Sequence, residues 1–168
     1  MKEFEYYITY QNLGCYSLDE HDNAWSDLLL EATEFEATIL ENKIYNTITL
    51  WLMTEGESAK EVINRTISQV SETGLNLSLK GAAPEFVSIN QLSELFDVSK
   101  QNIQAYMTGK RGKRKGIPPS PYSGVNDSSM WLLSEAAQWL RNKENHEIAD
   151  SLIDLGHAIR ETNSAHIH

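Results

Sequence analysis

The chain has 168 residues, of which 40% are hydrophobic and 9% aromatic, and its formal net charge is −10. This composition is typical of folded proteins and excludes a wholly disordered chain. No run approaches the roughly 18 apolar residues that cross a bilayer, and Met1–Tyr10 alternates where a signal peptide would have an apolar block. Cys15 is the only cysteine, which excludes an internal disulfide and a cysteine-based zinc site. We therefore expect a cytoplasmic protein with no membrane partner.

The charge is unevenly spread along the chain. Residues 1–84 carry 5 Lys/Arg against 14 Asp/Glu, residues 85–141 carry 7 against 5, and residues 142–168 carry 2 against 5. The middle segment is the only positive one, and five of the 14 basic residues lie between Lys110 and Lys115. Such an asymmetry predicts a local site for an anionic partner in the middle segment.

The N-terminal half begins with a strand, a helix and a hairpin. Phe4–Tyr10 alternates between apolar and other side chains, which is the period of a half-buried strand. Two β-rich runs on either side of Glu41–Lys43 predict the hairpin. Between them, Asn23–Thr33 has apolar residues at helical spacing, namely Trp25, Leu28, Leu29 and Ala32.

The next helix is marked by a capping box at Ser58 and Glu61, whose side chains each satisfy a backbone N–H group of the other residue. Gly74 can end this helix in a left-handed conformation, and Leu75–Lys80 then alternates as a fourth strand. The β-α-β-β-α-β order predicts two helices on one face of a four-stranded antiparallel sheet, the ferredoxin-like arrangement.

The ferredoxin-like fold does not name a function, because it hosts enzymes, RNA binders, ligand sensors and dimerisation modules. The strand Thr47–Met53 has no flanking basic residues, unlike the central strands of an RNA-recognition domain. The loop Asn12–Asn23 is only weakly like the Gly/Asp-rich ligand loop of an amino-acid sensor. The pattern favours a structural or dimerising domain, with ligand sensing as the alternative.

The middle segment contains two short helix patterns. Ser88 and Gln91 form a second capping box ahead of an apolar stripe. Asp97 stands where the chain must turn, and Ser99 is a good N-cap for the helix Lys100–Met107. Two short helices joined by so brief a turn predict a helix-turn-helix unit.

The second helix leaves long or small polar side chains on its outer face, of the kind that reach base edges from the major groove. The candidate base contacts are Lys100, Gln101, Gln104 and Thr108. The glycine-rich cationic loop behind this helix and the two serine N-caps suit phosphate oxygens. The candidate phosphate contacts are Ser88, Ser99, Lys110, Arg111, Lys113, Arg114 and Lys115. In an acidic chain this loop predicts a DNA-backbone clamp, with a solvated charge run as the alternative.

A small β-wing is expected after the basic loop. Prolines exclude a helix there, turn residues follow, and Met130–Leu133 predicts a short strand. Ser134 is the expected N-cap of a helix that packs back on the helix pair. We expect Trp131 and Trp139 in the core of this domain and not stacked on bases.

These motifs resemble the winged helix-turn-helix domain of mercury-resistance-regulator-like and prophage-excisionase-like DNA-binding proteins. The matching residues are Val98, Ser99, Pro118 to Pro121, Trp131, Ser134, Trp139 and Leu140. The chain up to about residue 141 also resembles bacterial two-domain proteins that join a small α/β half to this module. Asp97 replaces the usual turn glycine, which the left-handed tendency of Asp allows. The loop Lys110–Gly116 is longer and more basic than usual.

Residues 145–168 predict a C-terminal helix with a frayed end. Its apolar residues fit either a short coiled-coil-like seam or a helix packed on its own domain, and they are Ile148, Leu152, Leu155 and Ile159. The histidines of this tail are loosely spaced, so we expect no metal site and no cofactor.

No catalytic pattern emerges, because a Gly-rich phosphate loop, a His-Glu-x-x-His motif and a nucleophile elbow are all missing. The sequence predicts an α+β protein with domains over residues 1–83, 84–144 and 145–168 that is not an enzyme. We expect a sequence-specific regulator of transcription that binds double-stranded DNA as a homodimer and acts as a repressor. The alternatives are an antitoxin-like or adaptor protein that binds a protein partner through the acidic N-terminal domain, and a regulator gated there by a small molecule.

Overall fold

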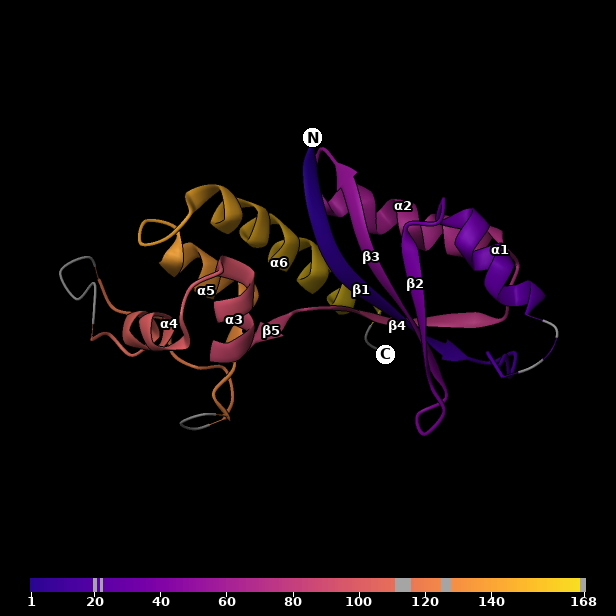
Figure 1. The fold of residues 1–168 in the computed structure, drawn as a ribbon, viewed down its shortest axis with the longest axis horizontal. Coiled ribbons are helices and arrows are strands. Elements are labelled where there is room, and N and C mark those ends of the chain that lie inside the picture. The colour runs from indigo at the N-terminus through magenta and orange to yellow at the C-terminus, as the bar shows by residue number, and fades with distance from the viewer. Residues whose placement is uncertain (20, 22, 111–115, 125–127, 167–168) are drawn as a thin grey trace. The chain divides into compact units, whose positions relative to one another are not determined.

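A computed structural model of the chain describes residues 1–19, 21, 23–110, 116–124 and 128–166. These residues form an α+β fold of six helices and six strands, and Figure 1 follows the chain through them. The chain divides into two compact units. Unit 1 consists of Met1–Ala83 and Ala158–His168, and unit 2 of Pro84–His157.

Unit 1 contains a four-stranded antiparallel sheet. Its strands and helices follow the predicted order, which is β1 (Lys2–Asn12), α1 (Ala24–Ala32), β2 (Ala37–Asn42), β3 (Thr47–Gly56), α2 (Ala59–Glu72) and β4 (Leu77–Ala83). The strands lie side by side in the order β2-β3-β1-β4, and each neighbouring pair is antiparallel. The two longest strands, β1 and β3, therefore form the centre of the sheet.

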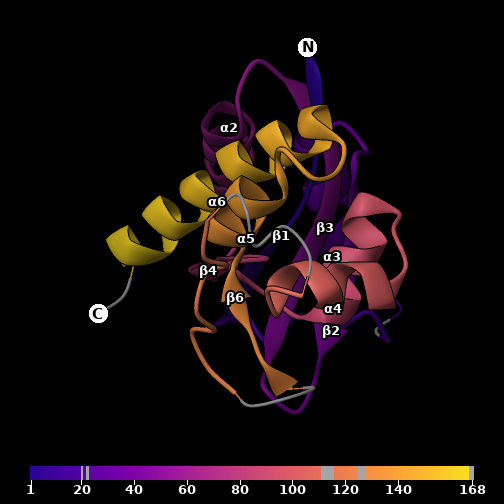
Figure 2. The ribbon, with the colours of Figure 1, turned by 90° about the vertical axis from the view of Figure 1, so that its left-hand side faces the viewer.

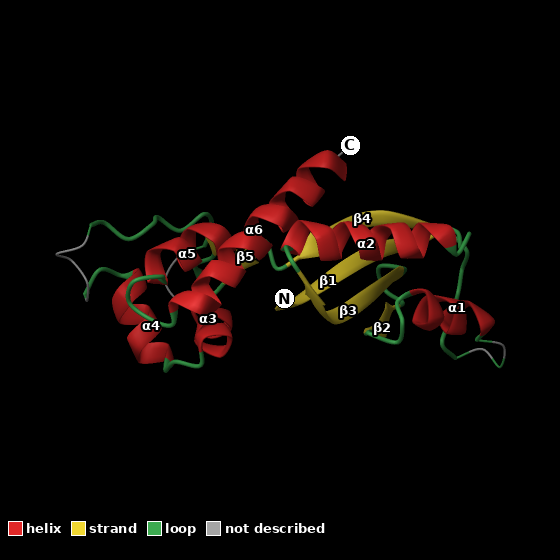
Figure 3. Cartoon of the chain, turned by 90° about the horizontal axis from the view of Figure 1, so that it is seen from above, coloured by secondary structure: helices red, strands yellow, loops and turns green. Residues whose placement is uncertain are grey.

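One face of this sheet forms the core of unit 1. The buried side chains of β1 alternate as the sequence predicted, and they are Phe4, Tyr6, Ile8 and Tyr10. Those of β3 alternate in the same way at Ile48, Leu50 and Leu52. Helix α2 lies along the sheet (Figure 3) and buries its apolar stripe there. In α1 the prediction was wrong for Leu28, which is exposed because the turn of the helix directs Trp25 and Leu29 inward instead.

Two buried tyrosines of β1 differ in their partners. The Tyr6 hydroxyl lies 2.8 Å from Thr66 Oγ1, and 3.2 Å from both Thr54 Oγ1 and the Val62 carbonyl oxygen. The Tyr10 hydroxyl has no hydrogen-bond partner in the described part of the chain. Burial raises the pKa of both phenols, and only for Tyr6 do hydrogen bonds to threonine hydroxyls lower the pKa in part.

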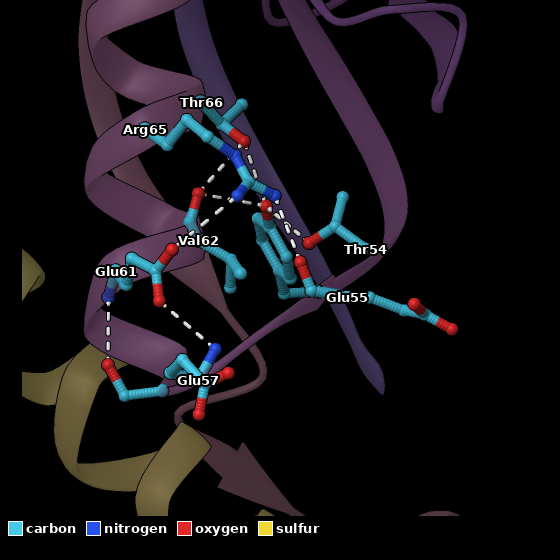
Figure 4. Close-up of polar contacts among 9 residues, drawn as sticks. Thr54, Glu55, Glu57, Glu61, Val62, Arg65 and Thr66 are labelled. Carbon is cyan, nitrogen blue, oxygen red and sulfur yellow. Dashed lines mark hydrogen bonds and ion pairs between the residues drawn. The ribbon is translucent and has the colours of Figure 1, made fainter. Parts of the chain in front are cut away.

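The capping of α2 differs from the prediction in one contact. Ser58 Oγ accepts from the Glu61 N–H as expected (3.2 Å), but the Glu61 carboxylate accepts from the N–H of Glu57, one residue before the cap (3.0 Å). Figure 4 shows these contacts together with Arg65, whose Nη2 donates to the Glu55 carbonyl oxygen (3.1 Å). The Arg65 side chain therefore ties α2 to the end of β3.

Unit 2 is built from short elements. They are β5 (Phe86–Val87), α3 (Ile89–Phe96), α4 (Lys100–Met107), β6 (Trp131–Leu132), α5 (Leu133–Leu140) and the first part of α6 (His146–His166). Strand β5 pairs with β6 in antiparallel register. Figure 2 shows α3 and α4 side by side, with β6 next to them.

Helix α5 does not begin as predicted. Leu132 occupies the N-cap position without a side-chain hydrogen bond, so the prediction that Ser134 caps this helix was wrong. The reason is that β6 runs directly into α5, where the Leu133 N–H donates to the Glu85 carbonyl oxygen (2.9 Å). Ser134 is buried in the first turn, and a Cβ on Gly156 of α6 would lie only 2.7 Å from its backbone nitrogen.

Helix α6 continues to His166, so the predicted frayed end is helical up to that residue. Its predicted seam is buried inside the chain at Leu152, Leu155 and Ile159, as expected for a helix packed on its own protein. In unit 1, the Asn163 amide donates to the Ala82 carbonyl (2.9 Å) and accepts from the Ala82 N–H (2.7 Å). This contact satisfies backbone groups of the edge strand β4. None of the helices in the described part of the chain has the length and apolar composition that a bilayer crossing requires.

Candidate nucleic-acid interface

The scaffold of the candidate site is the pair α3 and α4, and both helices are capped as predicted. Ser88 Oγ accepts from the Gln91 N–H (3.2 Å), and Gln91 Oε1 accepts from the Ser88 N–H (2.9 Å), which completes the capping box of α3. Ser99 Oγ accepts from the Asn102 N–H (3.2 Å) at the start of α4. Each hydroxyl uses its oxygen in the cap and retains its own O–H as a donor.

The turn between the helices is fixed by one left-handed residue. Asp97 has φ 53° and ψ 47°, the conformation that the sequence required at this position. The Ser93 hydroxyl donates to the Val98 carbonyl oxygen (2.6 Å), which holds the chain beyond the turn against α3. The turn therefore sets the direction in which α4 leaves α3.

Helix α4 has one buried and one exposed face. Ile103 and Met107 are buried, whereas Tyr106 is only half-buried. The Trp139 indole N–H donates to the Tyr106 carbonyl oxygen (3.0 Å) and so attaches α5 to the end of α4. The predicted base contacts are exposed on the other face, at Lys100, Gln101, Gln104 and Thr108.

The end of α4 separates Thr108 from the other three residues. Thr108 is the C-cap, and its hydroxyl donates to the Gln104 carbonyl oxygen (2.7 Å). Gly109 follows with φ +76°, and a Cβ there would lie 3.4 Å from Pro118. Lys110 is exposed. The other predicted phosphate contacts, Arg111, Lys113, Arg114 and Lys115, lie outside the described residues.

Where the sequence predicts a wing, the structure has an isolated antiparallel bridge between Ser123 and Met130, and we call the described segments around this bridge the wing. The Tyr122 N–H donates to the Met130 carbonyl (2.7 Å), and the Met130 N–H donates to the Ser123 carbonyl (2.8 Å). The Trp131 indole N–H donates to the Pro119 carbonyl (3.1 Å), so the proline segment is attached to β6. Trp131 is buried, as expected for a core residue.

A groove of about 760 Å³ runs between α4, the start of α3 and the wing. It brings together Lys100, Gln104 and Thr108, whereas Gln101 does not line it. Two further polar residues line the same groove and were not predicted, Asn90 of α3 and Ser129 of the wing. Asn90 is exposed two residues after the cap Ser88, so its position in the first turn of α3 was the available signal. Ser129 had no such signal in the sequence, because only the fold of the wing places it at the groove.

The charges of the two units differ strongly. Unit 1 has 6 Lys/Arg against 15 Asp/Glu, a net charge of −9, and unit 2 has 8 against 9, a net charge of −1. The groove lining contains one cation, Lys100, and no carboxylate among its described residues. Amide and ammonium groups on an exposed helix face can donate to and accept from base edges, and a weakly charged unit lets a polyanion approach.

In its described residues, the alternative ligand site Asn12–Asn23 of unit 1 contains hydrogen bonds within the chain. In the loop after β1, the Asn12 amide both donates to and accepts from the backbone of Tyr16 (2.7 and 3.0 Å). The Trp25 indole N–H donates to the Ser17 carbonyl oxygen (3.3 Å). These contacts give the Asn12 amide and the Trp25 indole a structural role in the described part of the loop. Among the described residues, no group of three or more His, Cys, Asp or Glu side chains is arranged to hold a metal ion.

A search of protein-family models, of curated proteins and of solved structures gives no significant match to this chain.

Proposed function

We propose that the protein is a regulator of transcription that binds double-stranded DNA through unit 2. The observation that carries this proposal is the exposed polar face of α4, held on buried Ile103 and Met107 beside a groove of about 760 Å³. Such a face has no structural task of its own, because the contacts that fix α4 come from its other side and from its caps. Long polar side chains on an exposed helix suit base edges in the major groove.

As part of this proposal, we assign a fold to each of the two units. The strand order β2-β3-β1-β4, with α1 and α2 inserted as in a β-α-β-β-α-β chain, supports a ferredoxin-like unit 1. The pair α3 and α4 with a left-handed turn, followed by the Ser123–Met130 hairpin, supports a winged helix-turn-helix unit 2. Both descriptions agree with the resemblance that the motifs carry.

In the proposed complex the residues divide the work between phosphates and bases. Lys100, Gln101 and Gln104 face the major groove from the first half of α4, the part of a recognition helix that usually contacts bases. The hydroxyl donors of Ser88 and Ser99 and the cations of Lys110–Lys115 bind phosphate oxygens, which adds affinity for all sequences. Thr108 contributes less to base recognition, because its hydroxyl already donates a hydrogen bond within α4.

Selection of binding sites from random duplexes by the full chain tests the proposal. On the preferred site, Lys100→Ala, Gln101→Ala or Gln104→Ala should each cost about 1–3 kcal/mol, and less on random DNA. Gln138→Ala is the matched control, because Gln138 is equally exposed but lies on α5, outside the groove. Failure to select any sequence, or equal losses for Gln104 and Gln138, would refute the assignment.

Salt dependence tests the phosphate interactions separately. Neutralising Lys110, Arg111, Lys113, Arg114 and Lys115 together should weaken binding to all sequences and lower the log–log salt slope by about one for each cation that no longer pairs with a phosphate. An unchanged slope would return this loop to the solvated alternative.

The proposed regulator is a homodimer, because a single module has a small interface and two copies double the base contacts on an inverted repeat. Buried Leu152, Leu155 and Ile159 are not available as a dimer seam, so we place the pairing on unit 1. Light scattering on the full chain is the suitable test, since removing residues 145–168 would also remove buried core. A monomer at tens of micromolar without a preference for palindromic duplexes contradicts the dimeric regulator.

A further inference from the structure

The second face of the sheet in unit 1, opposite the buried one, carries side chains that the core does not use. The positions of β1 and β3 that alternate with the buried ones hold Glu3, Glu5, Tyr7, Thr9 and Gln11, and Thr49, Trp51, Met53 and Glu55. We call these nine residues the open face. Both strands lie wholly in the described part of the chain, and the open face contains no Lys or Arg.

An aromatic pair lies at the centre of the open face. Tyr7 and Trp51 are directly opposite each other across β1 and β3, with ring centroids 6.3 Å apart and planes 13° from parallel. Tyr7 is 36% exposed and Met53, two residues beyond Trp51, is 48% exposed. The two rings therefore offer apolar surface and π-electrons to a molecule outside unit 1.

A carboxylate is held at the edge of this pair. The Trp51 indole N–H donates to Glu5 Oε1 (2.9 Å), which fixes the Glu5 side chain beside the ring. A carboxylate has about four lone-pair sites, so this hydrogen bond leaves further acceptor capacity. A planar cation that stacks on the Trp51 ring would find the Glu5 carboxylate in reach of its N–H groups.

Two more carboxylates lie one step along the strands. Glu3 is directly opposite Glu55 in the register of β1 and β3, and both are exposed. Like charges directly opposite each other destabilise a sheet. The sequence nevertheless places them beside Glu5, on a unit whose net charge is −9. A bound cation would remove this repulsion.

We propose that the open face binds an arginine-bearing peptide segment of another protein. One guanidinium stacks on the Tyr7–Trp51 pair and donates to Glu5, and a second cation lies between Glu3 and Glu55. The carboxylates that the two cations would meet, Glu5 and Glu3, are two residues apart on β1, a spacing of about 7 Å. The two carboxylate subsites therefore match cationic residues at positions i and i+2 of an extended peptide.

Charge complementarity selects this partner over two others. A second copy of the same face would bring the three carboxylates of one copy against the three of the other. RNA could stack its bases on the aromatic pair, but its phosphates would meet the same carboxylates without a compensating Lys or Arg among the nine residues of the open face. An arginine peptide gains from both the rings and the charges.

Titration of the full chain with three short peptides tests the inference at about 0.15 M salt, where bulk attraction is screened. The peptides are acetylated and amidated, and they carry Arg-x-Arg, Lys-x-Lys or citrulline-x-citrulline at the same positions. We expect binding in the order Arg, Lys, citrulline, because citrulline keeps the shape of arginine without its charge. Binding should shift the indole N–H resonance of Trp51, which is assigned by its loss in Trp51→Phe.

A charge-matched pair of variants locates the site. The triple variant Glu3→Gln, Glu5→Gln, Glu55→Gln should weaken Arg-x-Arg binding at least about tenfold. The control Glu31→Gln, Glu34→Gln, Glu72→Gln removes the same charge from exposed positions elsewhere in unit 1 and should change the dissociation constant less than about twofold. Thermal unfolding of both variants checks that they are folded.

Several binding results would overturn the inference. They are no binding of Arg-x-Arg up to about 1 mM, equal binding of the citrulline peptide, equal losses in the two triple variants, and tighter binding of single-stranded RNA than of peptide at Trp51. If the open face were instead the contact between two copies, the Glu3, Glu5, Glu55 variant would change the oligomeric state in light scattering, which also overturns it. The proposed DNA binding uses unit 2 and can stand or fall independently.

Discussion

Different contacts stabilise each of the two units. In unit 1, β1 pairs with β3 over ten consecutive residue pairs from Lys2↔Gly56 to Gln11↔Thr47, and one continuous buried face runs along both strands. In unit 2, β5 and β6 pair over two residues, and α3, α4 and α5 have eight residues each. Helices this short are marginal alone in water. Unit 2 therefore depends on the packing of its short elements against one another, and single substitutions at these contacts should affect it more than most substitutions in unit 1.

The close contact between Gly156 and Ser134 offers the largest effect. Alanine raises helix propensity by about 1 kcal/mol over glycine, but its Cβ would lie 2.7 Å from the Ser134 backbone nitrogen. We expect Gly156→Ala to lower the free energy of unfolding by about 1–3 kcal/mol through overpacking. Urea unfolding measures this loss. Ser151→Ala, at a half-exposed position of the same helix, is the control and should stay within about 0.5 kcal/mol of the wild type. An unchanged Gly156→Ala protein would show that the two helices can separate without cost.

Substitution of Tyr6 and Tyr10 tests whether unit 1, with its long β1–β3 pairing, tolerates the loss of a polar contact. Tyr6→Phe leaves Thr54 and Thr66 without their shared hydroxyl and should lower the free energy of unfolding by about 1–2 kcal/mol. Tyr10→Phe removes a buried hydroxyl that has no partner among the described residues, so it should be neutral or stabilising by up to about 1 kcal/mol. The same urea experiment compares them, and equal losses would mean that the Tyr10 hydroxyl has a partner in solution.

Alkaline pH should increase the effect of Tyr10→Phe. Burial raises the pKa of Tyr10 above its ordinary value of 10.0, since the folded state favours the neutral phenol. Because the pKa of Tyr10 is raised in the folded state, the contribution of its neutral phenol to the free energy of unfolding is complete below pH 10.0. This contribution is lost as the pH rises above that value. The stability of Tyr10→Phe relative to the wild type should therefore be constant up to about pH 10 and increase above it. A pH-independent difference between the two proteins would contradict this account.

The left-handed turn of unit 2 gives the smallest expected effect. Asp97 has φ 53°, a conformation that costs most residues about 1–2 kcal/mol and glycine almost nothing. Asp97→Gly should stabilise unit 2 by up to about 1 kcal/mol after the entropy of the unfolded chain is counted, and Asp97→Ala should destabilise it. Asp97→Asn is the matched control and should be close to neutral. If all three variants have the same stability, the turn does not limit unit 2.

The candidate site could be predicted from sequence where its cause is local. The caps at Ser88 and Ser99 could be predicted because each serine directly precedes a helical pattern. The backbone N–H three residues after each serine then needs an acceptor, which the serine hydroxyl supplies. The spacing of Ile103 and Met107 determines which face of α4 is buried, and so which polar residues are exposed. Ser129 could not be assigned in this way, because it reaches the groove only through the packing of the wing, and for Asn90 the sequence offered only its position in the first turn of α3.

For the fold, the sequence by itself determined the order of the elements, the alternation of β1 and β3, and the ends of α3 and α4. Each of these follows from contacts between residues that are close along the chain, and such contacts leave a period or a cap in the sequence. The α5 start and the burial of the α6 seam were decided by tertiary structure. β6 meets β5 more than 40 residues earlier in the chain, and Gly156 of α6 lies against Ser134 of α5. The final turns of α6 belong to unit 1, where Asn163 binds the backbone of Ala82. These contacts join segments that no local pattern connects, so only the folded chain shows which surfaces they bury and which they leave exposed.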